Sequence, residues 1–207
     1  MSAVLIGAGL QLTAQSVGPM DNNAYLLTNG SDALLIDAAA EAGVLLDLMA
    51  GLNLVGVVTT HRHADHIRAL AAVVAATGAP AYAGAPDAAA ITQATGVACR
   101  EVADGDAIAV GDVRLEVIGL VGHTPGSITL AHTPSDAPDR LFTGDSLFPG
   151  GVGKTRNSAD FDSLLRGVTS KLFDRFGDDT VVHPGHGAPT TLGVERPQLD
   201  EWRARRW

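Results

Sequence analysis

Residues 61–66, with the sequence HRHADH, are the stretch of the chain whose residue types and spacing best suit metal chemistry. They follow an apolar run that predicts a buried strand, and they precede a segment with helical spacing. Alternate side chains of an extended segment point to the same side, so His61 and His63 can bind one metal ion. Asp65 and His66 stand where the helix is expected to start and can bind a second ion about 3.5–4 Å from the first. A solvated turn in which Asp65 only caps the helix is the alternative interpretation.

Three more candidate ligands stand in separate loops, each directly after a glycine: His123, Asp145 and His186. Glycines allow loops to converge without clashes between Cβ atoms, and binding residues concentrate on such loops. Taken alone, each of the three is typical of a turn or surface residue. Together with residues 61–66 they supply five histidines and two aspartates, enough for two sites rich in nitrogen and oxygen ligands. We therefore predict two bound divalent ions, with Zn²⁺ favoured and iron or manganese as alternatives.

The elements that must position these residues alternate between strands and helices. Hydrophobic periodicity predicts strands at 10–17, 24–28, 34–37, 54–60, 79–83, 113–120, 127–132, 140–143 and 180–183, and helices at 41–52, 65–77, 86–95, 160–176 and 194–205. No Ser/Gly-rich linker divides this series. Two halves that each run from strands to helices predict an α/β fold, with two sheets packed face to face, helices outside, and a single domain spanning residues 1–207.

The composition limits the class of partner and the location. Hydrophobic residues make up 46% of the 207, enough to bury a core. Lys and Arg total 14 against 23 Asp and Glu, a formal net charge of -9, so a nucleic-acid partner is not expected. The apolar run at 3–12 is shorter than the roughly 20 residues of a membrane span and no basic residue precedes it, so we expect neither anchor nor signal peptide. Because Cys99 is the single cysteine, no internal disulfide can form, which favours a cytoplasmic location.

The order and spacing of these motifs resemble the metallo-β-lactamase superfamily, over roughly residues 10–190. The matching segments are Asp37 at a strand end, residues 60–66, GHTPG at 122–126, TGD at 143–145 and GHG at 185–187. This resemblance implies an αββα sandwich of two mixed β-sheets flanked by helices.

The same resemblance assigns a role to each candidate ligand. It implies a first ion held by His61, His63 and His123, and a second held by Asp65, His66 and His186. Asp145 would bridge the two ions. Asp37 would steady the ligand loops from behind.

The reaction that such a site suits is hydrolysis. Two divalent ions that share a water lower its pKa towards neutrality, so a bridging hydroxide can attack a carbonyl carbon. Asp65 is placed to orient that hydroxide or to move a proton, which makes it the expected catalytic residue. No Ser-His-Asp arrangement is visible in the sequence, so covalent catalysis by a serine is not expected.

Residues 142–154, FTGDSLFPGGVGK, most resemble the hydroxyacylglutathione hydrolases, also called glyoxalase II, which hydrolyse S-lactoylglutathione. In those enzymes a lysine matching Lys154 helps to hold a carboxylate of the thiol. We expect Lys154 and Arg156 to form a cationic patch that selects an acidic thioester of a small thiol. The thiol itself stays open, because Arg156 replaces the family's tyrosine and Gly187 and Ala188 replace its Glu-Tyr pair.

Other readings of the sequence compete with a thioesterase. A mononuclear iron persulfide dioxygenase of the same fold would use His61, His123 and Asp145, and residues 63–67 resemble its motif. Hydrolysis of a lactone or a β-lactam, and a non-catalytic metal-binding module, are further alternatives. A phosphate-binding loop at 149–155 is rejected, because the glycine that this pattern requires is replaced by Phe148.

Overall fold

The first β-sheet has seven strands, in the order β1-β2-β3-β4-β5-β6-β7, within residues 3–206, the part of the chain that the computed structural model describes. The strands are β1 (Val4–Leu5), β2 (Gln11–Val17), β3 (Asn22–Asn29), β4 (Asp32–Ile36), β5 (Asn53–Thr59), β6 (Ala81–Gly84) and β7 (Cys99–Val102). Neighbours from β1 to β4 are antiparallel and those from β4 to β7 are parallel. Parallel neighbours need crossover connections. These contain α1 (Ala42–Leu48), α2 (Leu70–Thr77) and α3 (Ala85–Thr95).

The second sheet has six strands, in the order β15-β14-β11-β10-β9-β8. Its strands are β8 (Ala107–Val110), β9 (Val113–Gly119), β10 (Ile128–His132), β11 (Arg140–Gly144), β14 (Val181–Pro184) and β15 (Thr190–Thr191), and β12 (Leu147–Phe148) pairs with β13 (Gly151–Val152) as a separate hairpin. Only β11 and β14 pair in parallel within this sheet of the described chain. The helices of this half are α4 (Ser158–Val168), α5 (Leu192–Glu195) and α6 (Leu199–Arg205).

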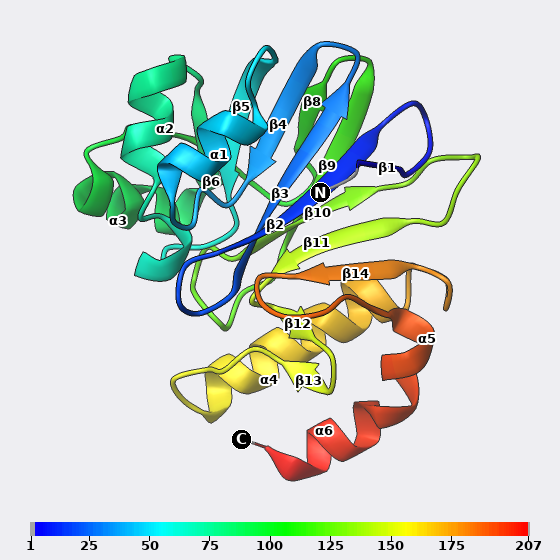
Figure 1. Cartoon of the computed structure of the whole chain (residues 1–207). Coiled ribbons are helices and arrows are strands. Elements are labelled where there is room, and N and C mark those ends of the chain that lie inside the picture. Colours follow the sequence, from blue (N-terminus) through cyan, green and yellow to red (C-terminus); the bar gives the residue numbers. More distant parts are fainter. Residues whose placement is uncertain (1–2, 207) are drawn as a thin grey trace.

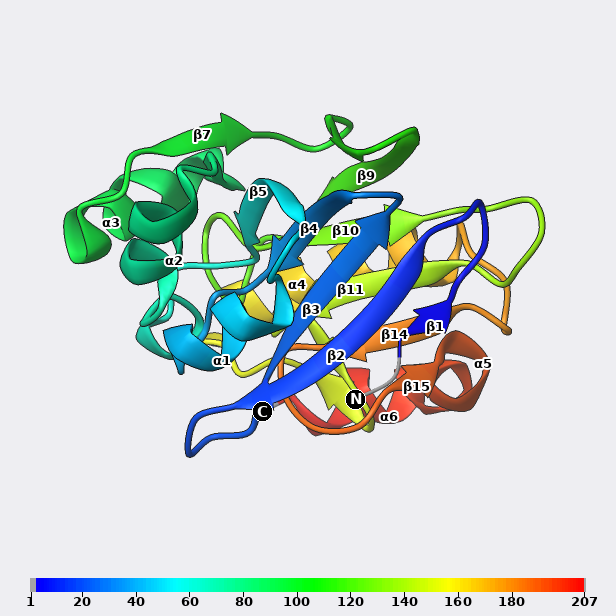
Figure 2. The ribbon, with the colours of Figure 1, turned by 45° about the horizontal axis from the view of Figure 1, so that its top comes forward.

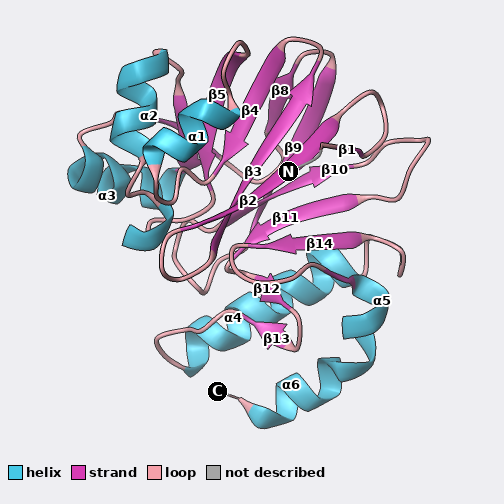
Figure 3. Cartoon of the chain, in the orientation of Figure 1, coloured by secondary structure: helices cyan, strands magenta, loops and turns pink. Residues whose placement is uncertain are grey.

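The two sheets stack face to face with helices on both outer sides. Figure 1 shows α1, α2 and α3 against the first sheet and α4, α5 and α6 beyond β14, and Figure 3 shows the same two groups of helices around the strands. In Figure 2, β2, β3 and β4 pass in front of β10 and β11. The predicted αββα sandwich of two mixed sheets flanked by helices is therefore confirmed.

Three apolar clusters correspond to these layers. The cluster between the sheets takes Leu27 and Leu34 from the first sheet and Leu130 and Phe142 from the second, all four completely buried. A second cluster joins the first sheet to α1, α2 and α3, and a third joins the second sheet to α4 and α6. Each fully buried side chain of this size stabilises the fold by about 1.5–3 kcal/mol. Burial of these apolar side chains thus holds the layers together, and the loops at the strand ends can carry functional residues.

The predicted helix over residues 65–77 is wrong in its first turns. Ala64–His66 forms a single 3-10 turn, and α2 begins only at Leu70. The N–H groups of Arg68 and Ala69 donate to carbonyls in the loop after β4, at 3.2 and 3.0 Å, instead of to helix carbonyls. These tertiary hydrogen bonds therefore shift the start of the helix to a later residue. Residues 61–66 form a loop that can turn its side chains inward.

The remaining differences from the predicted elements have local causes. The predicted helix over 194–205 is interrupted by a 3-10 turn, Arg196–Gln198, in which Pro197 lacks the N–H that a continuous helix needs. The helix predicted at 41–52 ends at Leu48. Asn157 caps α4 by accepting from the N–H of Asp160 at 2.9 Å, so α4 begins before its predicted start. The helix predicted to reach residue 176 continues beyond α4 as a π-helix, Thr169–Phe173. The short strands β1, β7, β8, β12, β13 and β15 were not predicted.

The helices were also compared with the length and hydropathy of a membrane span. Within residues 3–206, no helix is both long and apolar enough to cross a bilayer.

Candidate metal centre

The loops that carry the predicted ligands converge at one end of the stacked sheets. Each candidate ligand lies just beyond a strand end: residues 61–66 after β5, His123 between β9 and β10, Asp145 after β11 and His186 after β14. Backbone hydrogen bonds join these loops in pairs. The N–H of Ile128 donates to Thr60 at 2.9 Å, and the N–H of Gly185 donates to Gly144 at 2.8 Å. All seven predicted ligands are thereby brought together.

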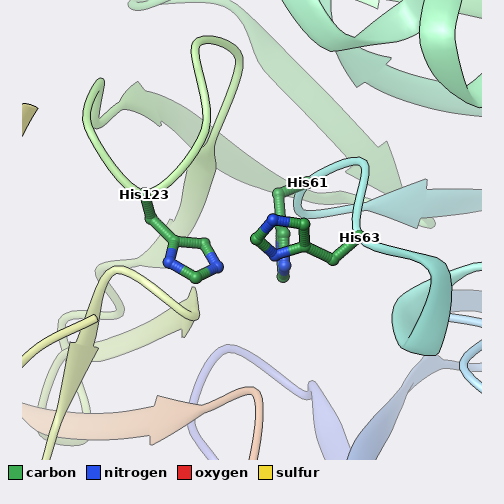
Figure 4. A group of neighbouring side chains, drawn as sticks. All are labelled: His61, His63 and His123. Atoms are coloured by element: carbon green, nitrogen blue, oxygen red, sulfur yellow. The ribbon is translucent and has the colours of Figure 1, made fainter. Parts of the chain in front are cut away.

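The first group of neighbouring imidazoles consists of His61, His63 and His123. Figure 4 shows the three rings turned towards one space, with His123 on a different loop from the other two. Ring centroids lie 4.7 Å apart for His61 and His63, 4.8 Å for His61 and His123, and 4.5 Å for His63 and His123. One nitrogen of each ring lies within 4.8 Å of the others. The rings of His61 and His123 are buried and that of His63 is exposed, so the group is open on the side of His63.

The second group consists of Asp65, His66 and His186, and Asp145 lies between the two groups. Asp65 Oδ2 lies 3.5 Å from His66 Nε2 and 3.3 Å from His186 Nε2. Asp145 Oδ1 lies 3.3 Å from His66 Nε2, and Asp145 Oδ2 lies 3.6 Å from His123 Nε2. One carboxylate therefore contacts both groups, in the position that the sequence assigned to a bridging ligand.

The far ring nitrogens of four of these histidines face oxygen atoms. The Nδ1 contacts are His66 with Asp37 Oδ2 (2.9 Å), His123 with the Lys154 carbonyl (2.7 Å), His186 with the Met20 carbonyl (2.9 Å) and His61 with Thr60 Oγ1 (3.1 Å). An oxygen acceptor at Nδ1 fixes a proton there and turns the lone pair of Nε2 towards the centre. The ring orientations are thus those of metal-binding histidines.

Several of the atoms that point into the centre lack partners within the protein. The Nε2 atoms of His61 and His123 and the Oδ1 atom of Asp145 are buried without a hydrogen bond to any residue of 3–206. The Nε2 atoms of His66 and His186 lie 3.2 Å apart, so a proton or a cation must lie between their lone pairs. Leaving a buried acceptor unpaired costs about 1–3 kcal/mol. Metal ions would satisfy these acceptors, and the nitrogen and oxygen donors suit zinc, iron and manganese.

The pKa values of the ligand side chains show how charge is balanced in the chain alone. Burial, together with neighbouring imidazoles, holds the pKa of His61 well below its usual value. Burial opposes the charged form of His66, but Asp37 and Asp145 outweigh it and raise the pKa of His66 to about 10. Burial acts to raise the pKa of Asp65, yet the hydrogen bond from Asn22 and the charge on His66 lower it. The carboxylates thus attract a positive charge into the centre, a role that metal ions can take over from the proton.

Asp37 connects the end of β4 to the loop of residues 61–66. Its carboxylate accepts hydrogen bonds from the Thr60 N–H at 2.7 Å, the Thr60 hydroxyl at 2.8 Å and His66 Nδ1 at 2.9 Å. Its backbone lies in the left-handed region, with φ of 59°, which short polar residues tolerate better than others. The buried carboxylate therefore holds both the strand end and one ligand ring, as expected for a residue that steadies the loop.

Asn22 belongs to the centre, and sequence reasoning missed it. Its buried side-chain amide donates to Asp65 Oδ2 at 2.9 Å and lies 3.4 Å from His186 Nε2. An Asp-Asn pair after a Gly-Pro turn is typical of a turn, so the residue carries no distinct signal of its own. A weak signal is its place as the first residue of β3, where a polar side chain at a strand end can meet the other strand-end ligands.

Two glycines make room for Asp145. A Cβ at Gly185 would collide with Asp145 Oδ1 and come within 2.8 Å of His66 Cε1. A Cβ at Gly153 would collide with the Asp145 carbonyl and come within 3.2 Å of His123 Nδ1. The glycines beside the ligands are therefore required by the close approach of the loops.

The two predicted substrate-binding cations, Lys154 and Arg156, line different hollows. Lys154 is exposed and lines a hollow of about 220 Å³ beside the β12–β13 hairpin, together with Phe148. The ring of Phe148 lies 6.4 Å from that of His186, so this hollow adjoins the metal centre. Arg156 lines a different hollow and forms an ion pair with Asp160 at 3.7 Å. A patch made of both residues therefore stays a prediction, and the contacts favour Lys154.

Comparison with known proteins gives a match that covers most of the chain. Residues 17–186 match the model of the Metallo-beta-lactamase superfamily. A hydroxyacylglutathione hydrolase from Anaeromyxobacter dehalogenans (strain 2CP-C) is 35% identical over 167 residues, which cover 80% of this chain and 61% of that protein. The chain thus spans about three fifths of the length of this relative.

Solved structures with the same architecture cover nearly all of both chains. The B3 metallo-beta-lactamase BLEG-1 superposes with a TM-score of 0.76 at 26% identity, covering 90% of this chain and 96% of the other. The protein TTHA1623, solved in a di-iron-bound form, superposes with a TM-score of 0.70 at 33% identity, covering 89% and 96%. The family match, the fold and the arrangement of the motifs show that this chain belongs to the metallo-β-lactamase superfamily, whose members include metal-dependent hydrolases.

Proposed function

We propose that this protein is a dinuclear metal-dependent hydrolase that cleaves hydroxyacyl thioesters of a small acidic thiol. The observation that carries the proposal is the position of Asp145, whose two carboxylate oxygens contact His66 Nε2 at 3.3 Å and His123 Nε2 at 3.6 Å. A ligand shared in this way suits two ions close together. Similarity to a hydroxyacylglutathione hydrolase supports the substrate class, and similarity to a protein solved with two irons supports the number of ions.

The ligand groups divide the work of binding the ions. We assign His61, His63 and His123 to the first ion and Asp65, His66 and His186 to the second, with Asp145 shared. When bound, two divalent ions lower the pKa of a shared water and polarise a carbonyl oxygen.

Asp65 is the residue of this chain that we assign to proton movement. Asn22 holds its Oδ2 atom, which lies 3.3 Å from His186 Nε2, so the carboxylate is fixed at the rim of the centre. A carboxylate in this place can orient a water and accept a proton from it. A thiolate leaves readily because the pKa of a thiol is only about 8.5. Thioesters therefore suit this centre better than amides, which need a stronger acid at the leaving group.

Lys154 is the residue that we assign to recognition of the acidic thiol. Its carbonyl accepts from His123 Nδ1 at 2.7 Å, which fixes the backbone of Lys154 beside the first ligand group. Its side chain lines the hollow that adjoins His186 through Phe148. An ammonium group here can bind a carboxylate of the thiol while the thioester carbonyl reaches the ions.

The experiment that tests the proposal is a substrate panel on protein with a measured metal content. The panel holds S-lactoylglutathione, an uncharged acyl thioester, a lactone and a β-lactam. We expect the acidic thioester to give the highest kcat/KM and a chelator to abolish its hydrolysis. Preference for the β-lactam or the lactone would replace the substrate assignment, and oxygen uptake on glutathione persulfide by protein with one iron would replace hydrolase by dioxygenase.

A further inference from the structure

Asp87 is a completely buried carboxylate to which neither the ligand groups nor the proposed reaction assign a role. It lies in the first turn of α3, outside the motifs that identify the centre. Its Oδ2 atom accepts from the Arg62 N–H at 3.0 Å and from the Thr124 hydroxyl, and its Oδ1 atom accepts from the Gly126 N–H at 3.0 Å. The Arg62 guanidinium lies 3.6 Å from Oδ1. Every hydrogen-bond donor that this carboxylate binds therefore belongs to a ligand loop.

The donors that bind Asp87 are neighbours of candidate ligands in the sequence. Arg62 stands between His61 and His63, and Thr124 directly follows His123. Asp87 thus joins the two loops that supply the first ligand group, which Figure 4 shows entering from opposite sides. Two of its three hydrogen bonds come from main-chain N–H groups, one on each loop, so the carboxylate fixes the path of both backbones.

The surroundings of Asp87 compensate for the burial of its carboxylate. Hydrogen bonds to a carboxylate are about twice as strong as those between neutral groups. The first turn of a helix also favours negative charge, by roughly 0.3–1 kcal/mol. Packing is tight on this side, since a Cβ at Gly126 would come within 2.8 Å of the Asp87 Cβ and one at Gly84 would collide with the Gly126 carbonyl. The N-terminus of α3 is therefore seated directly against the loop that carries His123.

We infer that Asp87 is the positioning residue of the first ligand group, in the way that Asp37 is for the second. Asp87 sets the distance between the loop of His61 and His63 and the loop of His123, whereas Asp37 binds Thr60 and orients His66. The inference rests on the proposed dinuclear centre. We therefore expect loss of the Asp87 carboxylate to weaken mainly the first ion. Loss of the Asp37 carboxylate should weaken mainly the second, because Asp37 contacts His66 directly and reaches His61 only through Thr60.

Asp87→Asn is the variant that tests this division. Asparagine has the same size, but it has one acceptor oxygen and adds N–H donors, which would face the N–H of Arg62 or of Gly126. We expect the affinity for the first ion to fall roughly 10–100-fold, the range for residues that orient metal ligands. The second ion should be retained. Thr124→Val keeps the shape of the side chain but removes its hydrogen bond to Asp87 and its contact with Ser127 Oγ at 2.7 Å, and it should weaken the first ion by a smaller factor.

Two further variants separate positioning from general loss of stability. Glu195→Gln removes another buried carboxylate, which accepts from the Gly150 N–H at 2.8 Å and the Thr190 hydroxyl at 2.7 Å, far in the chain from residues 61–66. It should leave the affinity for the first ion unchanged. Asp37→Asn should weaken the second ion through His66 and, by a smaller factor, the first ion through Thr60 and His61.

The readout is Zn²⁺ affinity by competition with a coloured chelator, together with anomalous scattering from crystals grown at limiting zinc. Loss of occupancy at His61, His63 and His123 alone, in both Asp87→Asn and Thr124→Val, is the expected result. Equal loss of both ions, no change, or the same loss in Glu195→Gln would overturn the inference, and Thr124→Val decides it if Asp87→Asn does not fold. A wild-type protein that binds no second ion would instead contradict the proposed function, while the effect of Asp87 on the first ion stays measurable.

Discussion

The two halves of the metal centre are built from different kinds of sequence. The first sheet supplies four candidate ligands within residues 61–66, directly after β5. The second sheet supplies three, His123, Asp145 and His186, from three loops that are distant in the chain. A compact cluster can be read from its spacing, because one turn of backbone determines where its side chains point. Ligands that are dispersed in the sequence form a site only when the order of the strands brings their loops together.

The means of support differ in the same way. In the first half, the buried carboxylates of Asp37 and Asp87 hold the loop of residues 61–66. In the second half, backbone hydrogen bonds position the ligands. Strands β11 and β14 pair in parallel, and the N–H of Gly185 donates to the Gly144 carbonyl at 2.8 Å. This pairing sets Asp145 and His186 side by side. Replacing a supporting side chain should therefore weaken metal binding by the first half. Adding a side chain at a glycine beside the backbone should weaken metal binding by the second half.

The largest effect is expected for Asp145→Ala, because the Asp145 carboxylate contacts both ligand groups. Both ions should be lost together, with each affinity falling by more than the roughly 100-fold that outer residues cause. Metal content per chain and thioester hydrolysis measure this. Asp160→Ala, which removes a carboxylate paired with Arg156, should retain both ions. If Asp145→Ala lost only one ion, the shared role would be wrong.

Gly185→Ala should give the next largest effect and tests the support of the second half. The added methyl group would overlap Asp145 Oδ1 and crowd His66. We expect overpacking to lower the free energy of unfolding by about 1–3 kcal/mol, and both metal affinities to fall with it. Gly43→Ala is the matched control in the first half, since a Cβ there meets nothing within 4 Å. Denaturant unfolding and zinc titration of the two variants decide the question, and equal behaviour would contradict the account.

Lys154→Ala should change recognition and leave the metal centre intact. For an acidic thioester, KM should rise roughly 10–100-fold, as expected for a lost hydrogen bond to a charged group of about 1.5–3 kcal/mol. The uncharged thioester should be almost unaffected. Arg156→Ala is the control, because Arg156 is already paired with Asp160, and it should change KM much less. An equal effect of Lys154→Ala on both substrates would show that Lys154 does not bind the carboxylate.

The smallest effect concerns His183, a buried histidine on β14 that lies outside the ligand groups. Its ring stacks on Phe142 at 5.0 Å between centroids, and burial together with Arg140 lowers its pKa to about 4. The unfolded chain, with a pKa near 6.5, takes up the proton first as the pH falls. Stability should therefore decrease from about pH 6.5 towards pH 4, by about 1 kcal/mol between pH 7 and 5.5.

Unfolding of wild type and His183→Gln at both pH values measures this contribution. The free energy of unfolding should fall between pH 7 and pH 5.5 by about 1 kcal/mol less in the variant than in the wild type. An identical pH dependence would mean that His183 does not stay neutral in the folded protein.

The sequence predicted the side chains that converge at the candidate centre better than the residues that position them. Residues 61–66 were recognisable because several metal-binding types stand at strand-end spacing, and glycines before His123 and His186 mark loops that approach closely. Asn22 and Asp87 were missed, since an asparagine in a turn and an aspartate in the first turn of a helix are ordinary there. The helix predicted from residue 65 failed for a related reason, because the N–H groups of residues 68 and 69 bind a loop that is distant in the sequence.

Anomalous scattering from crystals of the wild-type protein grown with zinc tests the central claim most directly. We expect two peaks about 3.5–4 Å apart. One should lie among His61, His63 and His123, and the other among Asp65, His66 and His186. Both should be in contact with Asp145. A single peak in saturating zinc, or two peaks of which only one contacts Asp145, would contradict a centre that the two halves of the molecule share.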